Sequence, residues 1–160
     1  MIDFFEDIAI GQKIVLGTHT FSIDEIKNYA TRYDPQPFHV DEDAAARTHF
    51  GGLCASGWHT ATIWMRLMVS YRRRQAEAQL ARGEPVAELG PSPGFRELRW
   101  LKPVRPGDTL TYATEIVETR TSNSRPGWGL ISTLNTGTNQ AGELVVSWIS
   151  SAFVQRRTPA

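Results

Sequence analysis

The chain has 160 residues, with 17 Lys and Arg against 17 Asp and Glu, and a single cysteine, Cys54. The formal net charge is therefore zero, whereas nucleic-acid binders usually carry an excess of basic residues. A single cysteine excludes a disulfide framework and a cysteine-rich zinc site. No apolar run approaches the roughly 18 residues of a membrane span, and the N-terminus lacks the basic and apolar regions of a signal peptide. We therefore expect a single domain spanning residues 1–160, in the cytoplasm, without nucleic-acid or membrane partners.

The first elements predicted are a strand and a helix. Residues 13–22 (KIVLGTHTFS) are rich in β-branched and apolar side chains, which favours a strand. Ser22 and Glu25 have the spacing of a capping box, in which each side chain binds a free N–H of the first helical turn. A helix is therefore expected over residues 23–33.

A long apolar helix is predicted in the middle of the chain. It follows a short helical segment at residues 41–47 and two glycines. Ser56 suits an N-cap, because its hydroxyl can accept a hydrogen bond from a free N–H, and this places the helix start at Gly57. Residues 58–69 are apolar nearly all round, which predicts a helix buried on most sides, and the polar residues that follow should emerge into solvent.

The last third of the sequence predicts four strands. Runs of strand-forming residues occupy 95–104, 109–121, 128–139 and 143–157. Their connections are short, which favours antiparallel neighbours because parallel ones need a longer crossover. One strand, a short helix, one long apolar helix and four antiparallel strands indicate an α+β fold. In such a fold a twisted sheet can curl around the long helix.

The segment YATRYDPQPFHVDEDAAA places Asp34 and His39 five residues apart, with two prolines between them. Pro35 biases Asp34 away from helical geometry, so the preceding helix should end there. Two interpretations remain. An Asx-Pro turn would leave His39 on the surface. Alternatively, a rigid loop would fix the carboxylate and the imidazole around one small reactant, where together they can hold a water molecule and exchange protons at neutral pH.

Gly57 also permits two interpretations. Glycine at a helix start allows close packing, and the free N–H groups of a first turn can stabilise a developing negative charge such as an enolate oxygen. Cys54, or Ser56 with His59, would suit a nucleophile and base, but sequence proximity does not supply the geometry. No second histidine stands at ligand spacing beside the acids of this region, so no metal site is expected.

The segment around Asp34 resembles the signature of the MaoC-like dehydratases and the R-specific enoyl-CoA hydratases. That signature runs from an aromatic residue through an acid, a proline, a histidine and a second acid to an alanine. The matching positions here are Tyr33, Asp34, Pro37, His39, Asp41 and Ala46. The stretch FGGLCASGWHT resembles the family's approach to its central helix. RWLKPVRPGDTL and NQAGELV resemble its later strand–turn–strand units, so the resemblance spans most of the chain.

This resemblance implies a hotdog fold, in which an antiparallel sheet wraps a long helix. It also implies a homodimer or larger assembly that binds acyl-CoA in a tunnel at the subunit interface. It makes Asp34 and His39 the catalytic pair, and Gly57 the backbone N–H donor to the thioester oxygen. The expected reaction is the reversible hydration of a 2-enoyl-CoA to a 3-hydroxyacyl-CoA. Coenzyme A is then part of the substrate, and no separate cofactor is expected.

The expected substrate-binding residues are Trp58, Ser56, Gln36 and Met65. Three of them depart from the family: Ser56 stands where many members have histidine, Gln36 where asparagine is frequent, and Met65 where several hydratases have serine. Trp58, Trp64 and Met65 together suggest a bulky pocket wall, suited to short or branched acyl chains.

Two alternative functions remain open, because one fold can host several chemistries. The first is an acyl-CoA thioesterase, which needs a carboxylate near the carbonyl but usually lacks the Asp-Pro-x-Pro-x-His loop. The second is a non-catalytic acyl-CoA-binding partner subunit, which would keep the loop without turnover.

Overall fold

A computed structural model describes residues 4–157 as one antiparallel sheet with a long helix on one face. The strands are β1 (Lys13–Thr20), β2 (Gly94–Trp100), β3 (Thr109–Thr121), β4 (Trp128–Thr138) and β5 (Leu144–Gln155). Their spatial order is β1-β3-β4-β5-β2, and every neighbouring pair is antiparallel, as predicted. β2 ends at Trp100 rather than at the predicted residue 104. Leu101 still donates one backbone hydrogen bond to Val145 of β5, but Pro103 has no N–H to donate to a ladder, and residues 102–104 leave the sheet.

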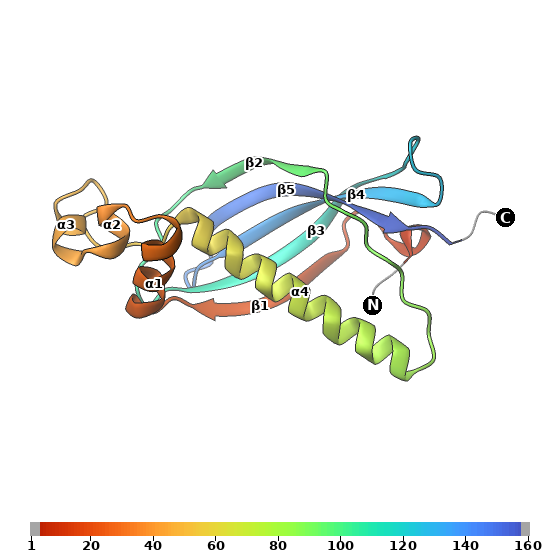
Figure 1. Ribbon diagram of the computed structural model, residues 1–160, viewed down its shortest axis with the longest axis horizontal. Helices are drawn as coiled ribbons and strands as arrows, with labels where there is room; N and C mark the ends of the chain where they lie inside the picture. Colours follow the sequence, from red (N-terminus) through yellow and green to blue (C-terminus); the bar gives the residue numbers. More distant parts are fainter. Residues whose placement is uncertain (1–3, 158–160) are drawn as a thin grey trace.

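The short helices α1 (Ile23–Tyr33), α2 (Pro37–Val40) and α3 (Glu42–Ala46) gather at one end of the sheet, beside the start of the long helix α4 (Gly57–Ala81) (Figure 1). A further short helix, η1 (Phe5–Asp7), precedes β1. α1 and α4 begin where the sequence predicts. The Ser22 hydroxyl accepts a hydrogen bond from the Glu25 N–H at 3.2 Å, as the capping pattern requires. α2 was predicted as a loop. Pro37 presets the backbone angle of a first helical turn, which explains this short helix.

α4 lies across one face of the sheet (Figure 1). The hydroxyl of Tyr112 on β3 donates a hydrogen bond to the Thr60 carbonyl at 3.0 Å. Trp64 packs edge-on against Trp148 of β5, with ring centroids 5.0 Å apart. These contacts place the core between the first turns of α4 and the sheet. Within residues 4–157, no helix is long and apolar enough to span a membrane.

The opposite side of α4 is exposed, so the prediction of a helix buried on most sides is wrong for a single chain. Trp58, Met65 and Val69 are 50%, 54% and 57% exposed. The sheet covers only one side of the helix, and the edge strand β2 beside it is itself largely exposed. We call Trp58, Met65, Phe95 and Trp100 the apolar face, since Trp58 contacts Trp100 and lines a small cavity with Met65 and Phe95.

Candidate active site

A cavity of about 450 Å³ opens where α2, the start of α4 and the segment after β2 meet. Asp34, His39 and Gly57, which are separate in sequence, all line it. Other aromatic and polar residues of its wall are Phe38, Phe50, Trp58, Trp100, Gln36, Thr60 and Lys102. The fold therefore brings the three predicted catalytic residues to one open cavity, whose wall includes two phenylalanines and two tryptophans.

Asp34 lies at the C-terminal end of α1, where the backbone leaves helical geometry before Pro35. Gln36 Nε2 donates a hydrogen bond to its Oδ1 at 2.9 Å, and Ser56 Oγ donates to its Oδ2 at 2.7 Å. Burial raises the pKa of Asp34, but these two hydrogen bonds and the charge of His39 lower it by more, so the pKa lies below its ordinary value. Asp34 is therefore ionised at neutral pH.

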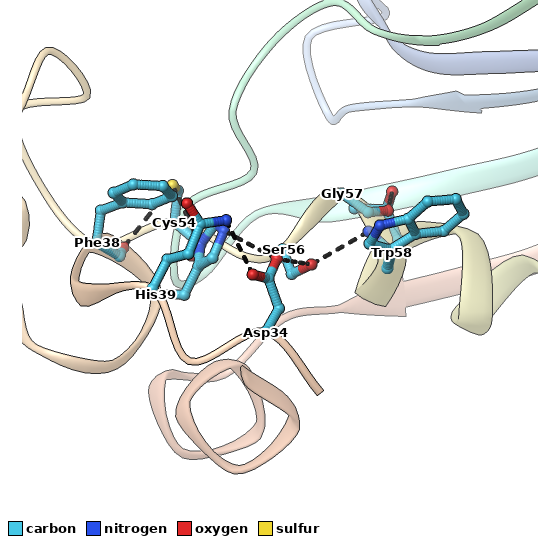
Figure 2. Close-up of polar contacts among 9 residues, drawn as sticks. Asp34, Phe38, His39, Cys54, Ser56, Gly57 and Trp58 are labelled. Carbon is cyan, nitrogen blue, oxygen red and sulfur yellow. Dashed lines mark hydrogen bonds and ion pairs between the residues drawn. The ribbon is translucent and has the colours of Figure 1, made fainter. Parts of the chain in front are cut away.

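His39 lies in α2 and is only 5% exposed, so a turn that leaves it on the surface is wrong. Its Nδ1 is 2.7 Å from the Cys54 carbonyl oxygen. A carbonyl only accepts, so Nδ1 carries the hydrogen, and in the neutral ring Nε2 holds a lone pair. Nε2 is 3.4 Å from Asp34 Oδ2, which is too long for a strong hydrogen bond. Figure 2 shows the two side chains facing each other.

Gly57 is the first residue of α4 and lines the same cavity. In the described part of the chain, no group accepts a hydrogen bond from its N–H. A Cβ at this position would lie 2.4 Å from Cε2 of the Trp100 ring, so only glycine allows this approach. The close packing expected of Gly57 is confirmed, while its role as a donor to a substrate oxygen stays a prediction.

Two of the four predicted substrate-binding residues line the cavity, and two do not. Gln36 and Trp58 are in its wall. Ser56 is fully buried and directs its hydroxyl to Asp34 instead of the cavity, because it occupies the N-cap of α4. Met65 lies eight residues further along the helix, about 12 Å from its start, and belongs to the apolar face. Ser56 thus takes the N-cap position that the sequence predicts and Met65 lies within the predicted helix, but neither lines the cavity as expected of a substrate-binding residue.

Neither alternative nucleophile has a base in place. Cys54 Sγ lies 3.7 Å from His39 Nδ1, but that nitrogen carries the hydrogen donated to the Cys54 carbonyl and cannot take the thiol proton. Burial raises the pKa of the Cys54 thiol, although the charge of Arg105 opposes this, so the thiol stays protonated at neutral pH. The ring of His59 stacks on Tyr29, with centroids 4.3 Å apart, and its Nε2 is 3.6 Å from the Glu25 carboxylate. Burial lowers the pKa of His59 to about 4, which makes it a neutral core residue at pH 7.

Sequence reasoning missed the groups that hold His39 in place. The Arg105 guanidinium donates hydrogen bonds to carbonyl oxygens in residues 50–53, at 2.6 Å for Gly52. This loop leads directly into Cys54, whose carbonyl fixes the hydrogen on His39 Nδ1. Arg105 belongs to the RPGD turn that the sequence does indicate. Its contacts lie more than 50 residues back along the chain, where no local spacing could reveal them.

A family model for the MaoC-like domain matches residues 7–126, three quarters of the chain. The chain belongs to the MaoC-like dehydratase and hydratase family. A MaoC-like dehydratase of Rhodospirillum rubrum shares 37% of its sequence and superposes with a TM-score of 0.80, covering 98% of this MaoC-like chain and 99% of that one. These findings confirm the resemblance predicted for the segment around Asp34.

Two further relatives bear on fold and function. A mesaconyl-CoA hydratase of Cereibacter sphaeroides is 39% identical over 160 residues, which is 98% of this MaoC-like chain but only 42% of that relative. An R-hydratase of Pseudomonas aeruginosa, 23% identical, superposes with a TM-score of 0.62 over 96% of this chain and 86% of that one. The second likeness concerns the fold alone. The predicted hotdog fold is confirmed.

Proposed function

We propose that this MaoC-like protein is a hydro-lyase that reversibly adds water to a 2-enoyl-CoA, giving a 3-hydroxyacyl-CoA. The observation that carries this proposal is the approach of Asp34 Oδ2 to His39 Nε2 at 3.4 Å in a cavity that Gly57 also lines. A water molecule beside this pair can donate one hydrogen bond to each atom. Water addition needs a base and a proton source at one place, and the pair supplies both.

The hydrogen bonds of the two residues assign the proton transfers to His39 and the orienting role to Asp34. The lone pair on His39 Nε2 takes a proton from water while the water oxygen forms a bond to the β-carbon of the substrate. Asp34 remains an anion, orients the water and stabilises the imidazolium. The imidazolium then returns a proton from Nε2 to the α-carbon. The net change is the addition of one water molecule, and both residues end in their starting states.

The amide of Gly57 acts on the other end of the reacting system. Attack at the β-carbon moves negative charge onto the thioester oxygen. A free N–H of a first helical turn is suited to stabilise that charge, because the helix dipole favours an anion there. Support comes from the unshared N–H of Gly57 and its place in the cavity wall. Coenzyme A is part of the substrate, and this mechanism needs no separate cofactor.

The aromatic wall supports a short or branched acyl group. Trp58 and Trp100 pack edge-on at 5.2 Å beside the catalytic pair, which restricts the space for a long chain. The relative from Cereibacter sphaeroides is named for mesaconyl-CoA, so this thioester is the first to test after a simple one.

A spectrophotometric assay with crotonyl-CoA, and then with mesaconyl-CoA, tests the proposal. Loss of the enoyl absorbance without release of free coenzyme A is the expected result. Release of free coenzyme A would instead identify a thioesterase. No change with either thioester would favour a non-catalytic acyl-CoA-binding subunit.

We further propose that the protein is a homodimer. The apolar face is exposed in a single chain, and the edge strand β2 leaves backbone groups unpaired along its outer side. Trp58 and Trp100 belong both to this face and to the cavity wall. A second copy packed here would therefore cover the face and complete the cavity.

Analytical sedimentation at micromolar concentration is expected to give about twice the chain mass of 17.9 kDa. Met65→Asp should reduce the mass to that of one chain, because a charge would be buried in an apolar interface. Ile10→Asp, at an apolar position that is 65% exposed and outside the apolar face, is the matched control and should leave the dimer intact. A single-chain mass for the natural sequence would contradict the proposal.

A further inference from the structure

The N-cap of α4 touches the active site through one hydroxyl group. Ser56 is 0% exposed, yet both hydrogen-bonding functions of its side chain are used. Its Oγ accepts a hydrogen bond from the Trp58 N–H at 3.2 Å and donates one to Asp34 Oδ2 at 2.7 Å. Figure 2 shows the resulting chain from the first turn of the helix to the carboxylate.

The direction of this chain follows from the chemistry of its members. A backbone amide can only donate, so the Ser56 oxygen must accept from Trp58. The hydroxyl hydrogen is then available to Asp34, which accepts it as an ionised carboxylate. Linked hydrogen bonds polarise one another, and a donor that is already oriented needs no reorganisation when it binds an anion. The positive end of the helix dipole also favours this negative charge.

We propose that Ser56 is a positioning residue, which uses the N-terminus of α4 to hold the Asp34 carboxylate ionised and correctly oriented beside His39. The proposal rests on the hydratase function proposed above. One helix end then serves two anions. Through Ser56 it stabilises a carboxylate of the protein, and through the Gly57 N–H it stabilises the oxygen of the substrate.

The surroundings of Asp34 make Ser56 its dominant fixed partner. Burial by itself raises the pKa of this carboxyl. The largest contribution that lowers the pKa is the hydrogen bond from Ser56, followed by the hydrogen bond from Gln36 and then by the charge of His39. Gln36 is exposed, so water competes for its contact. The other titratable groups of the cavity are the Cys54 thiol, which is protonated, and Lys102, which pairs with Glu143. Neither replaces the hydroxyl.

A purely structural N-cap would explain the contact with Trp58 but not the contact with Asp34. The chain contains a comparison for this alternative. Ser22 caps α1 through the Glu25 N–H at the same distance of 3.2 Å. Its hydroxyl touches no catalytic group. Alanine is a poor N-cap, whereas glycine is nearly as good as serine, so the two substitutions separate capping from donation to the carboxylate.

The experiment titrates the Asp34 carboxyl carbon by NMR in protein labelled with ¹³C-aspartate, using Asp34→Asn to assign the signal. Ser56→Ala, Ser56→Gly and Ser22→Ala are compared with the natural sequence. We expect the proton affinity of Asp34 to rise about tenfold in both Ser56 variants, because a hydrogen bond to an ionised group is lost. Ser22→Ala should leave this affinity unchanged. Thermal melting should show a larger loss for Ser56→Ala than for Ser56→Gly.

Turnover of crotonyl-CoA at neutral pH supplies the second measurement. Both Ser56 variants should lower kcat by about tenfold with KM unchanged, whereas a residue that binds substrate directly would mainly raise KM. An unchanged proton affinity in Ser56→Gly, or an equal rise in Ser22→Ala, would overturn the proposal. The titration needs no substrate, so absence of turnover with both crotonyl-CoA and mesaconyl-CoA in the natural sequence would refute the hydratase function without deciding the role of Ser56.

Discussion

Asp34→Asn is expected to lower kcat for hydration of crotonyl-CoA by about 10²–10⁴-fold, the usual contribution of a general acid–base group. Asparagine keeps the shape, and its amide oxygen can still accept the hydrogen bond from Ser56. It lacks the negative charge that orients the water and stabilises the His39 imidazolium. Stopped assays of purified natural protein and variant at neutral pH measure the effect.

His39→Ala should reduce kcat by a similar factor, because it removes the nitrogen that carries the proton. The two residues act on one water molecule, so the double variant should be little worse than the worse single variant. Asp43→Asn makes the same chemical change at an exposed acid of α3 and should retain full activity. Full activity in Asp34→Asn would refute the hydratase mechanism.

Gly57→Ala is expected to reduce kcat/KM by about 10²-fold or more, since displacements of about 1 Å in a catalytic constellation can have effects of this size. The new methyl group would lie 2.4–2.6 Å from three atoms of the Trp100 ring. Atoms that are not bonded to each other do not approach so closely, so the indole or the first turn of α4 must move. Trp100 forms part of the cavity wall, and the movement therefore changes the place where substrate binds.

A second substitution distinguishes this steric cause from damage to the helix itself. Gly57→Ala combined with Trp100→Ala removes the clash and keeps the amide, so it should recover activity towards the level of Trp100→Ala alone. Circular dichroism should show that all three variants fold. Natural activity in Gly57→Ala would contradict the packing at this position, and a double variant as inactive as Gly57→Ala would locate the damage in α4.

Much of the fold is readable from local chemistry. Ser22 and Glu25 mark the start of α1, and Pro35 marks its end, because capping and proline sterics act over a few residues. The short connections between the last strands indicate that these strands are antiparallel, because parallel neighbours need a longer crossover. The helix α2 could not be predicted from hydrophobic periodicity, since four residues are too few to show a helical period. The exposed side of α4 could not be predicted either, because an apolar helix does not reveal how far a sheet extends around it.

The candidate site divides in a similar way. Asp34 and His39 lie within six consecutive residues, and their spacing with the prolines can be recognised in sequence. The contact of Ser56 with Asp34 spans 22 positions, and the contact of Arg105 with Gly52 spans 53. Neither has a local signature, because each depends on where the tertiary fold places an ordinary serine or arginine. The N-cap position of Ser56 was predicted correctly, but its contact with Asp34 was not foreseen.

The hydrogen bonds from Arg105 to residues 50–53 determine which part of the chain would have to be grafted to transfer this active site to another protein. The segment 34–39 would carry the two reactive groups, but neither the tautomer of His39 nor the ionisation of Asp34 would travel with it. Those properties reside in the Cys54 carbonyl and the start of α4. The smallest transferable unit is thus a discontinuous one. This unit consists of the segment from α1 to the start of α4 together with the turn between β2 and β3 that contains Arg105. A graft that omits the turn would leave the imidazole of His39 free to reorient.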